Sequence, residues 1–160
     1  YYEKIGLERE KFEIYADEWV AEYNRRAPQT GLYPGCREAL AYFRDAGCRQ
    51  YLLSATEREM LAGQLAPLDI ASFFDDIVGQ DDTRAHGKLA AAVEWSKKVR
   101  LGAALLIGDS LHDAEVAAAI GADCVLLACG HQSRARLEAT GCRVLDTVTD
   151  LLHAAEKGEL

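Results

Sequence analysis

Several features that identify particular classes of protein are scarce or absent in these 160 residues. The 18 basic side chains are outnumbered by 26 acidic ones, which gives a net charge of −8, and they form no basic stripe. Nucleic acid and anionic membrane surfaces are therefore poor partners. The apolar runs are far too short to span a bilayer, and no signal peptide is recognisable. This is the composition of one globular domain, with room for a small appendage.

The cysteines follow neither the pattern of a zinc site nor that of a disulfide framework. No C-x-x-C spacing occurs, and a zinc site needs closer ligand spacing than these residues have. The five cysteines, an odd number, are Cys36, Cys48, Cys124, Cys129 and Cys142. Three of them lie in or beside apolar, strand-like runs. We expect small buried thiols in a reducing compartment, which predicts a cytoplasmic protein.

Proline is also rare, and its distribution divides the chain. Two of the three prolines lie in residues 25–34, together with a glycine, and this marks the stretch as a linker. Ahead of it, residues 8–25 are predicted to form a helix with an apolar stripe that packs against a neighbouring helix. The stripe comprises Phe12, Tyr15, Ala16, Trp19, Val20 and Tyr23. We therefore expect two parts, residues 1–30 and residues 31–160.

Beyond the linker, helical patterns alternate with short apolar strands. Strands are predicted at about 50–54, 77–78, 103–107, 123–128 and 143–145. Helices are predicted at about 34–46, 56–65, 86–99, 110–120, 133–139 and 148–156. Thr56 and Glu59 have the spacing of a capping box at the start of the second of these helices. Because the strands are apolar on both faces, we expect an α/β fold, a parallel Rossmann-like sheet with helices on both faces.

Residues 103–113 carry the strongest chemical signal. Five apolar residues lead into Gly108, and Asp109 and Asp113 follow four positions apart. Open α/β sheets bind ligands at the carboxyl ends of their strands, and two carboxylates there suit a hard cation such as Mg²⁺. The alternative is structural: Asp113 stabilises the first turn of the helix and Asp109 is a turn residue. On this stretch alone both interpretations stay open.

Two further polar positions follow or lie beside predicted strands. The hydroxyl of Ser54 and the backbone N–H of Ala55, at the start of a helix, can hold phosphate oxygens. Lys88 supplies a positive charge that can neutralise developing negative charge. Singly, Ser54 is as well explained as a turn residue and Lys88 as a solvated lysine. Because all of these positions fall on one edge of a parallel sheet, together they form most of a phosphoryl-transfer site.

In this order the motifs resemble those of the haloacid dehalogenase superfamily of Mg²⁺-dependent phosphohydrolases. The family's second motif, an apolar strand that ends in Ser or Thr, is matched by residues 51–54. Its third, a lone lysine, is matched by Lys88, and its fourth, an apolar strand followed by G-D-x-x-x-D, by residues 103–113. Residues 33–35 and 120–123 resemble flanking segments of the family. The resemblance covers about residues 31–157 and is greatest to the phosphoglycolate phosphatase-like branch.

The resemblance implies a role for each matched residue. Ser54 would hydrogen-bond the transferring phosphoryl group of a small phosphorylated substrate, and Lys88 would neutralise its charge. Asp109 would bind Mg²⁺, while Asp113 would lie at the same metal site and order a metal-bound water or Lys88. Residues 1–30 would be the later part of a helical cap, and residues 31–160 the core of the fold.

The sequence departs from the family in one large respect. The first motif, D-x-D-G-T, which carries the nucleophilic aspartate and the general acid/base, does not occur in it. We therefore expect a central strand, between those ending near Ser54 and Ile107, to come from a segment ahead of Tyr1 or from another chain. Without it this chain would be inactive and would fold poorly, because both neighbouring strands lose core contacts.

Several alternatives remain open at this stage. His131 either contacts substrate or lies in a surface turn that is led by Ser133. A phospho-acceptor receiver domain is disfavoured, because its acids precede its hydroxyl and lysine, whereas Asp109 and Asp113 follow both. A non-catalytic binding or regulatory module of the same fold, or a phosphomutase, fits the same motifs. The sequence leaves the substrate and the oligomeric state, a homo-oligomer included, undetermined.

Overall fold

The computed structural model describes residue 6, residues 8–80 and residues 87–160. The chain divides into two compact units, Tyr1–Gly31 and Leu32–Leu160, and each is described by itself. No helix among the described residues is both long enough and apolar enough to cross a membrane.

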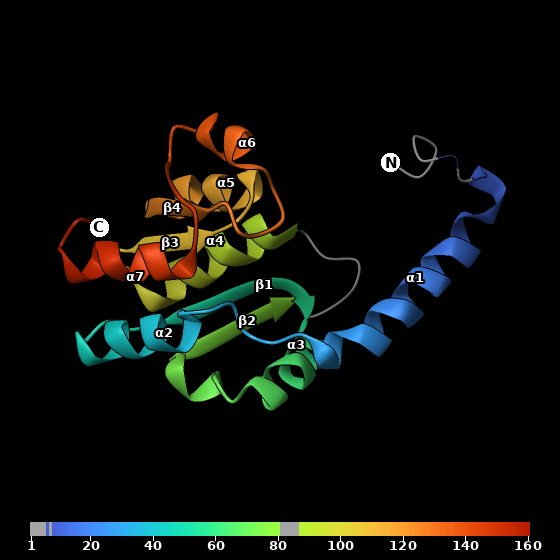
Figure 1. The fold of residues 1–160 in the computed structure, drawn as a ribbon, viewed down its shortest axis with the longest axis horizontal. Helices are drawn as coiled ribbons and strands as arrows, with labels where there is room; N and C mark the ends of the chain where they lie inside the picture. The colour runs from blue at the N-terminus through green and yellow to red at the C-terminus, as the bar shows by residue number, and fades with distance from the viewer. Residues whose placement is uncertain (1–5, 7, 81–86) are drawn as a thin grey trace. The chain divides into compact units, whose positions relative to one another are not determined.

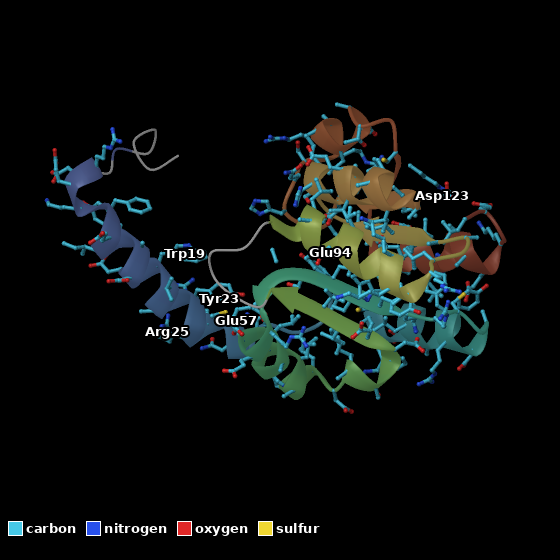
Figure 2. The ribbon with its side chains drawn as sticks, turned by 180° about the vertical axis from the view of Figure 1, so that it is seen from behind. Trp19, Tyr23, Arg25, Glu57, Glu94 and Asp123 are labelled. Carbon is cyan, nitrogen blue, oxygen red and sulfur yellow. The ribbon has the colours of Figure 1, made fainter. Side chains whose placement is uncertain are left out.

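The first unit is built around one long helix. It consists of the 3₁₀ turn η2 (Arg9–Lys11), helix α1 (Phe12–Arg26) and the 3₁₀ turn η3 (Ala27–Gln29). The aromatic stripe is exposed rather than packed against a second helix: Trp19 is 59% exposed and stacks on Tyr23 with ring centroids 5.4 Å apart (Figure 2). Helix α1 is the only α-helix described in this unit, so the packing of the stripe against a neighbouring helix stays a prediction.

The second unit has the predicted α/β fold with parallel strands, but its strands form two sheets (Figure 1). The first sheet pairs β1 (Tyr51–Glu57) with β2 (Asp76–Gln80). The second has the order β3 (Leu105–Gly108), β4 (Asp123–Leu127) and β5 (Arg143–Leu145). Every pairing is parallel, so within each sheet the carboxyl ends of the strands lie at one edge.

Helices cover both faces of these sheets. They are α2 (Cys36–Asp45), α3 (Arg58–Leu65), α4 (Gly87–Val99), α5 (Leu111–Ile120), α6 (Arg134–Glu138) and α7 (Val148–Glu156). The 3₁₀ turns η4 (Ala66–Leu68) and η5 (Ala71–Phe73) precede β2. On one face, α4 packs on β1 and β2, α5 packs on β3 and β4, and the two helices contact each other. On the other face α2 contacts α7, which packs on β5.

Helix α2 contributes side chains to both hydrophobic clusters of the unit. Leu40 packs against the cluster beneath the first sheet, and Phe43 against the cluster beneath the second. The hydroxyl of Tyr42 donates a hydrogen bond to the carbonyl of Ala155 in α7, at 3.0 Å. Because α2 reaches both clusters, it holds the two sheets together on this face.

The structure corrects the predicted junction between the first strand of the core and the next helix. Strand β1 continues past Ser54 to Glu57, with a register shift against β2 between Leu53 and Glu57. The residue that caps α3 is Glu57, and not Thr56 with Glu59 as predicted. The carboxylate of Glu57 accepts the backbone N–H groups of Glu59 and Met60, each at 3.0 Å. The side chain of Glu57 is long enough to reach both amides although the residue itself still belongs to the strand.

Candidate functional site

The carboxylate of Asp109 lies at the carboxyl end of β3, as the sequence predicts. Its Oδ2 atom accepts the backbone N–H of His131 at 2.7 Å, and the residue is half-buried. His131 belongs to the loop that follows β4, the neighbouring strand. The contact arises because β3 and β4 are parallel and therefore deliver their following loops to the same edge.

Asp113 is the buried acid of the site and is 4% exposed. Its Oδ2 atom accepts the backbone N–H groups of Asp109 and Ser110, each at 3.0 Å, and the Ser110 hydroxyl at 2.7 Å. Ser110 in turn caps Asp113, so the two residues form a complete capping box at the start of α5. The capping box is the structural role that the sequence left as an alternative, and the same carboxylate also fixes the backbone that presents Asp109.

The loop after β4 is also tied to the start of α5. The side-chain carbonyl of Gln132 accepts the backbone N–H of Leu111 at 3.1 Å. The imidazole of His131 is exposed, and the contact with Asp109 is made by its backbone. Ser133 stands at the N-cap position of α6, but its side chain makes no capping hydrogen bond. Gln132 was not singled out from the sequence, because glutamine after a strand carries no motif.

Two glycines permit the close packing of this site. A Cβ atom on Gly130 would lie 2.2 Å from Oδ2 of Asp109, and one on Gly108 would lie 2.3 Å from Cβ of Asp113. Real Cβ atoms do not approach other atoms so closely, so a larger residue at either position would have to displace the aspartate. The absence of a side chain at Gly108 makes room for Asp113. Gly130 was missed, since only the folded chain brings it to Asp109.

Ser54 belongs to the other sheet. Its hydroxyl accepts the backbone N–H of Thr56 at 3.1 Å, within the irregular part of β1. Ala55, in the same segment, is exposed. Lys88 lies in the first turn of α4, but its side chain falls outside the described structure. The contacts of the described residues thus join Asp109, Asp113 and His131, whereas Ser54 and Ala55 come from a separate sheet.

The donor set at Asp109 suits Mg²⁺. This ion binds proteins through one or two carboxylates and keeps several waters or substrate oxygens. Asp109 offers a half-buried carboxylate whose orientation is fixed by the N–H of His131, and Asp113 holds the backbone behind it. Within residues 8–80 and 87–160, no three His, Cys, Asp or Glu side chains gather as a metal-binding group. One oriented carboxylate is compatible with the few protein ligands that Mg²⁺ takes.

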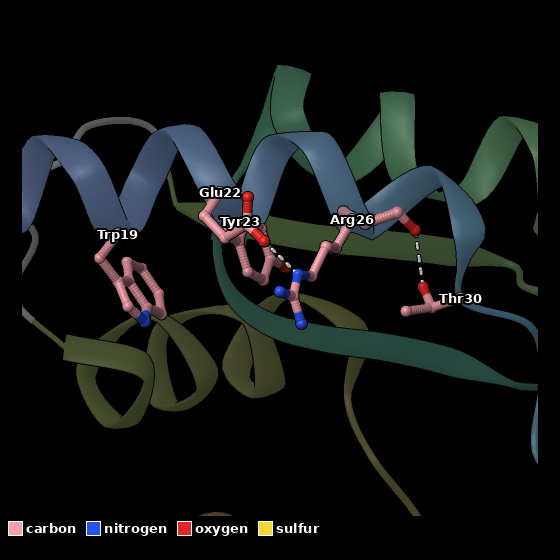
Figure 3. A pocket seen from close by; sticks show the side chains of 6 residues that line it. Trp19, Glu22, Tyr23, Arg26 and Thr30 are labelled. Carbon is pink, nitrogen blue, oxygen red and sulfur yellow. Dashed lines mark hydrogen bonds and ion pairs between the residues drawn. The ribbon is translucent and has the colours of Figure 1, made fainter.

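A separate hollow lies on the first unit, along α1 and η3 (Figure 3). It is lined by Trp19, Glu22, Tyr23, Arg26, Ala27 and Thr30. Glu22 forms ion pairs with Arg25 and Arg26 at its rim, which lower the pKa of the Glu22 carboxyl. It is a surface feature of the helical unit.

Comparison with known sequences identifies relatives of this chain. A family model described as haloacid dehalogenase-like hydrolase matches residues 1–127. The phosphoglycolate phosphatase of Pseudomonas savastanoi pv. phaseolicola is 28% identical over 151 residues, which are 92% of this chain and 56% of that protein. Phosphoglycolate phosphatase 1 of Pseudomonas aeruginosa is 26% identical over 97% of this chain and 58% of its own length. The chain thus spans little more than half the length of these curated relatives.

Solved structures agree on the fold. A haloacid dehalogenase-like family hydrolase from Streptococcus pneumoniae superposes with a TM-score of 0.81 at 18% identity, covering 94% of this chain and 72% of that one. The protein tyrosine kinase A of Mycobacterium tuberculosis gives a TM-score of 0.78 at 24% identity, covering 95% and 73%. At such low identity these likenesses show the fold alone.

Proposed function

This chain belongs to the haloacid dehalogenase-like hydrolases, and we propose that it carries the metal-binding part of a Mg²⁺-dependent phosphohydrolase for a small phosphorylated metabolite. One observation carries the proposal: Asp109, in the family's G-D-x-x-x-D motif, is held at the carboxyl end of β3 by the backbone of His131. A carboxylate at this edge of a parallel sheet can bind a metal that also binds a phosphate oxygen.

Each matched residue has a proposed task. Asp109 binds the Mg²⁺, which supplies neutralising charge to the phosphate when bound. Asp113, through its hydrogen bonds to the N–H groups of Asp109 and Ser110, keeps Asp109 in place. The hydroxyl of Ser54 and the N–H of Ala55 bind phosphoryl oxygens, and Lys88 neutralises the charge of the nucleophile and the phosphate.

The covalent chemistry requires an aspartate that these 160 residues do not supply, because no D-x-D-G-T sequence occurs in them. In the proposed reaction, an oxygen of that aspartate attacks phosphorus while the bond to the substrate's alcohol oxygen breaks, and a proton from a general acid completes the alcohol. Water then attacks the aspartyl-phosphate, which releases inorganic phosphate and regenerates the carboxylate. The whole protein, with this aspartate in place, is therefore the catalyst that we propose.

The substrate class follows from the relatives and remains part of the proposal. Both Pseudomonas relatives are named phosphoglycolate phosphatase, so phosphoglycolate is the first compound to assay. We further propose a cytoplasmic enzyme, in keeping with five cysteines that are all free thiols. A phosphomutase would instead return the phosphoryl group to a sugar, and phosphate release distinguishes the two reactions.

The test is Asp109→Asn in the whole protein, with phosphate release from phosphoglycolate measured with and without Mg²⁺. Asparagine keeps an oxygen for the N–H of His131 but removes the charge, so the fold should survive while Mg²⁺-dependent turnover falls at least about a hundredfold. The matched control is Asp123→Asn, an exposed aspartate at the amino end of β4 (Figure 2). Full activity of the Asp109→Asn variant would contradict the proposal that Asp109 binds Mg²⁺. An inactive parent protein would favour a non-catalytic module.

A further inference from the structure

Two junctions meet at the carboxyl edge of the second sheet, one leading from β3 to α5 and the other from β4 to α6 (Figure 1). The two junctions exchange hydrogen bonds. The backbone N–H of His131 donates to Oδ2 of Asp109 at 2.7 Å. In return, the backbone N–H of Leu111 donates to the side-chain carbonyl of Gln132 at 3.1 Å. Because His131 and Gln132 are adjacent in the chain, the two bonds hold the same short piece of the loop against the site.

The bond to Gln132 is not needed to begin helix α5. The first N–H groups of a helix have no partner within it and need one from elsewhere. In α5 a complete capping box, formed by Ser110 and Asp113, already caps the start of the helix. Asp113 also accepts the N–H groups ahead of the helix, those of Asp109 and Ser110. The effect of the Gln132 bond is therefore expected in the loop that carries it.

The loop after β4 depends on this contact for its position. At one end, the N–H of Ala128 still bonds to β5, and at the other the carbonyl of Ser133 already accepts N–H groups from α6. Between these ends, the hydrogen bonds that join residues 129–132 to other described segments are those of His131 and Gln132. Without the anchor at Gln132, the contact between the loop and the carboxylate would depend on the His131 bond alone.

We infer that Gln132 is a positioning residue for Asp109. By anchoring the loop to α5, its side chain keeps the N–H of His131 on the carboxylate, and the carboxylate keeps one orientation. A group that is already oriented loses less conformational freedom on binding, so its affinity for a cation is higher than that of a freely rotating carboxylate. The effect on orientation stands on these contacts, whereas the effect on Mg²⁺ also rests on the proposed function.

Two substitutions separate the acceptor from the size of the side chain. Gln132→Met has a similar length but no strong acceptor, whereas Gln132→Glu retains an oxygen that can accept the N–H of Leu111. The matched control is Gln29→Met, which removes the hydrogen bond from a glutamine side chain to the carbonyl of Arg25 in the first unit. All three are made in the whole protein, and circular dichroism verifies that each variant folds.

Amide hydrogen exchange in the metal-free protein tests the positioning without any reaction. We expect Gln132→Met to speed exchange at His131 at least about tenfold, and Gln132→Glu and Gln29→Met to exchange like the parent. The amide of Leu111 loses its acceptor in Gln132→Met in either case, so faster exchange there alone would mean that Gln132 is only a helix cap. Equally faster exchange at Val116, in the middle of α5, would mean a general loosening. Either result would overturn the inference.

Calorimetric titration with Mg²⁺ alone connects the positioning to the proposed function. We expect the dissociation constant to rise about three- to tenfold in Gln132→Met, less than the usual effect of removing a direct partner of a metal ligand. Phosphate release from phosphoglycolate should fall at limiting Mg²⁺ and recover as Mg²⁺ is raised, which a general loss of structure would not produce. Because the charge of Gln132→Glu can itself attract a cation, that variant is compared by exchange only.

The two measurements can fail separately. Faster exchange at His131 with a weaker affinity for Mg²⁺ supports both the positioning and the proposed metal site. Faster exchange with an unchanged affinity for Mg²⁺ supports the positioning and contradicts the proposal that Asp109 binds the metal. Unchanged exchange at His131 in Gln132→Met overturns the inference, whatever the affinity for Mg²⁺.

Discussion

Gly130 approaches Asp109 so closely that a Cβ atom on it would lie 2.2 Å from Oδ2 and 2.3 Å from Cβ of the aspartate. The next residue in the chain donates its N–H to the same oxygen. The loop after β4 therefore fixes the position of the carboxylate in two ways. Gly130 leaves the space that the carboxylate fills, and the N–H of His131 donates a hydrogen bond to it. A side chain at position 130 has to displace Asp109, and the displacement breaks the bond to the backbone of His131.

Replacing Gly130 by alanine tests this relationship. The backbone at Gly130 lies outside the left-handed region, so alanine strains the site through contact alone. We expect Gly130→Ala to fold but to lose about ten- to a hundredfold in Mg²⁺-dependent activity, the usual effect of disturbing support around a metal ligand. Gly102→Ala is the control, because nothing lies within 4 Å of a Cβ there. Equal activity of the two variants would show that Asp109 needs no such support.

The side chain of His131 can be tested separately from its backbone. Because its N–H, and not its imidazole, holds Asp109, His131→Ala should leave the metal site and the melting temperature unchanged. If the exposed imidazole contacts the substrate, KM rises while kcat changes little. Steady-state kinetics on phosphoglycolate measure the two constants. Unchanged kinetics would reject the substrate contact and favour a surface turn.

Cys124 should be chemically inert at neutral pH. Burial raises the pKa of its thiol to about 12, and the neighbouring Cys142 adds to the shift. Since the thiolate is the reactive form, alkylation by iodoacetamide at pH 8 should be at least about a hundredfold slower at Cys124 than at the exposed Cys48. Peptide mass spectrometry over time measures both rates in one sample. Comparable rates would mean that the Cys124 thiol is accessible and ionised.

The cap of α3 should make stability depend on pH. The N–H groups of Glu59 and Met60 lower the pKa of the Glu57 carboxyl in the folded chain. Its contribution is therefore complete above the ordinary value of 4.5 and is lost as the pH falls through the lowered pKa. Glu57→Gln should melt at a lower temperature at pH 7, and the difference should shrink below about pH 4.

A control on a different helix isolates the effect of the cap. Glu94 is exposed in the interior of α4 (Figure 2), where no free amide needs a cap. Glu94→Gln should melt close to the parent across the same pH range. A Glu57→Gln variant whose melting curve matches that of Glu94→Gln at pH 7 would show that the capping bonds add no stability.

Much of the fold was predictable because the second unit has strong local patterns. The strands at Leu105–Gly108 and Asp123–Leu127 are apolar on both faces, which favours burial in a parallel sheet. The end of β1 could not be predicted, because the sequence Ser-Ala-Thr-Glu at residues 54–57 resembles a helix cap more than a strand. Its extension to Glu57 depends on pairing with β2, which local sequence does not contain. The split into two sheets falls between β1 and β3, where the missing first motif led us to expect a further strand.

Of the residues at the candidate site, only the two aspartates could be singled out from the sequence. Asp109 and Asp113 have a characteristic spacing, and the sequence also suggested that Asp113 stabilises the helix start, which the capping box confirms. Gly130 and Gln132 carried no signal, because their importance comes from atoms of Asp109 and Leu111 more than twenty residues away. Backbone groups such as the N–H of His131 are the same in every sequence. Only the fold reveals which of them are used.

The hydrogen bond from Tyr42 to Ala155 joins residues 113 positions apart, and this separation bears on how the unit assembles. The pairings within each sheet connect much nearer segments, so each sheet can form as an early, independent folding unit. Docking of α2 on α7 closes a much longer loop than the strand pairings do. The entropic cost of closing this loop therefore arises late in folding. We therefore expect Tyr42→Phe to accelerate unfolding and to leave the folding rate almost unchanged.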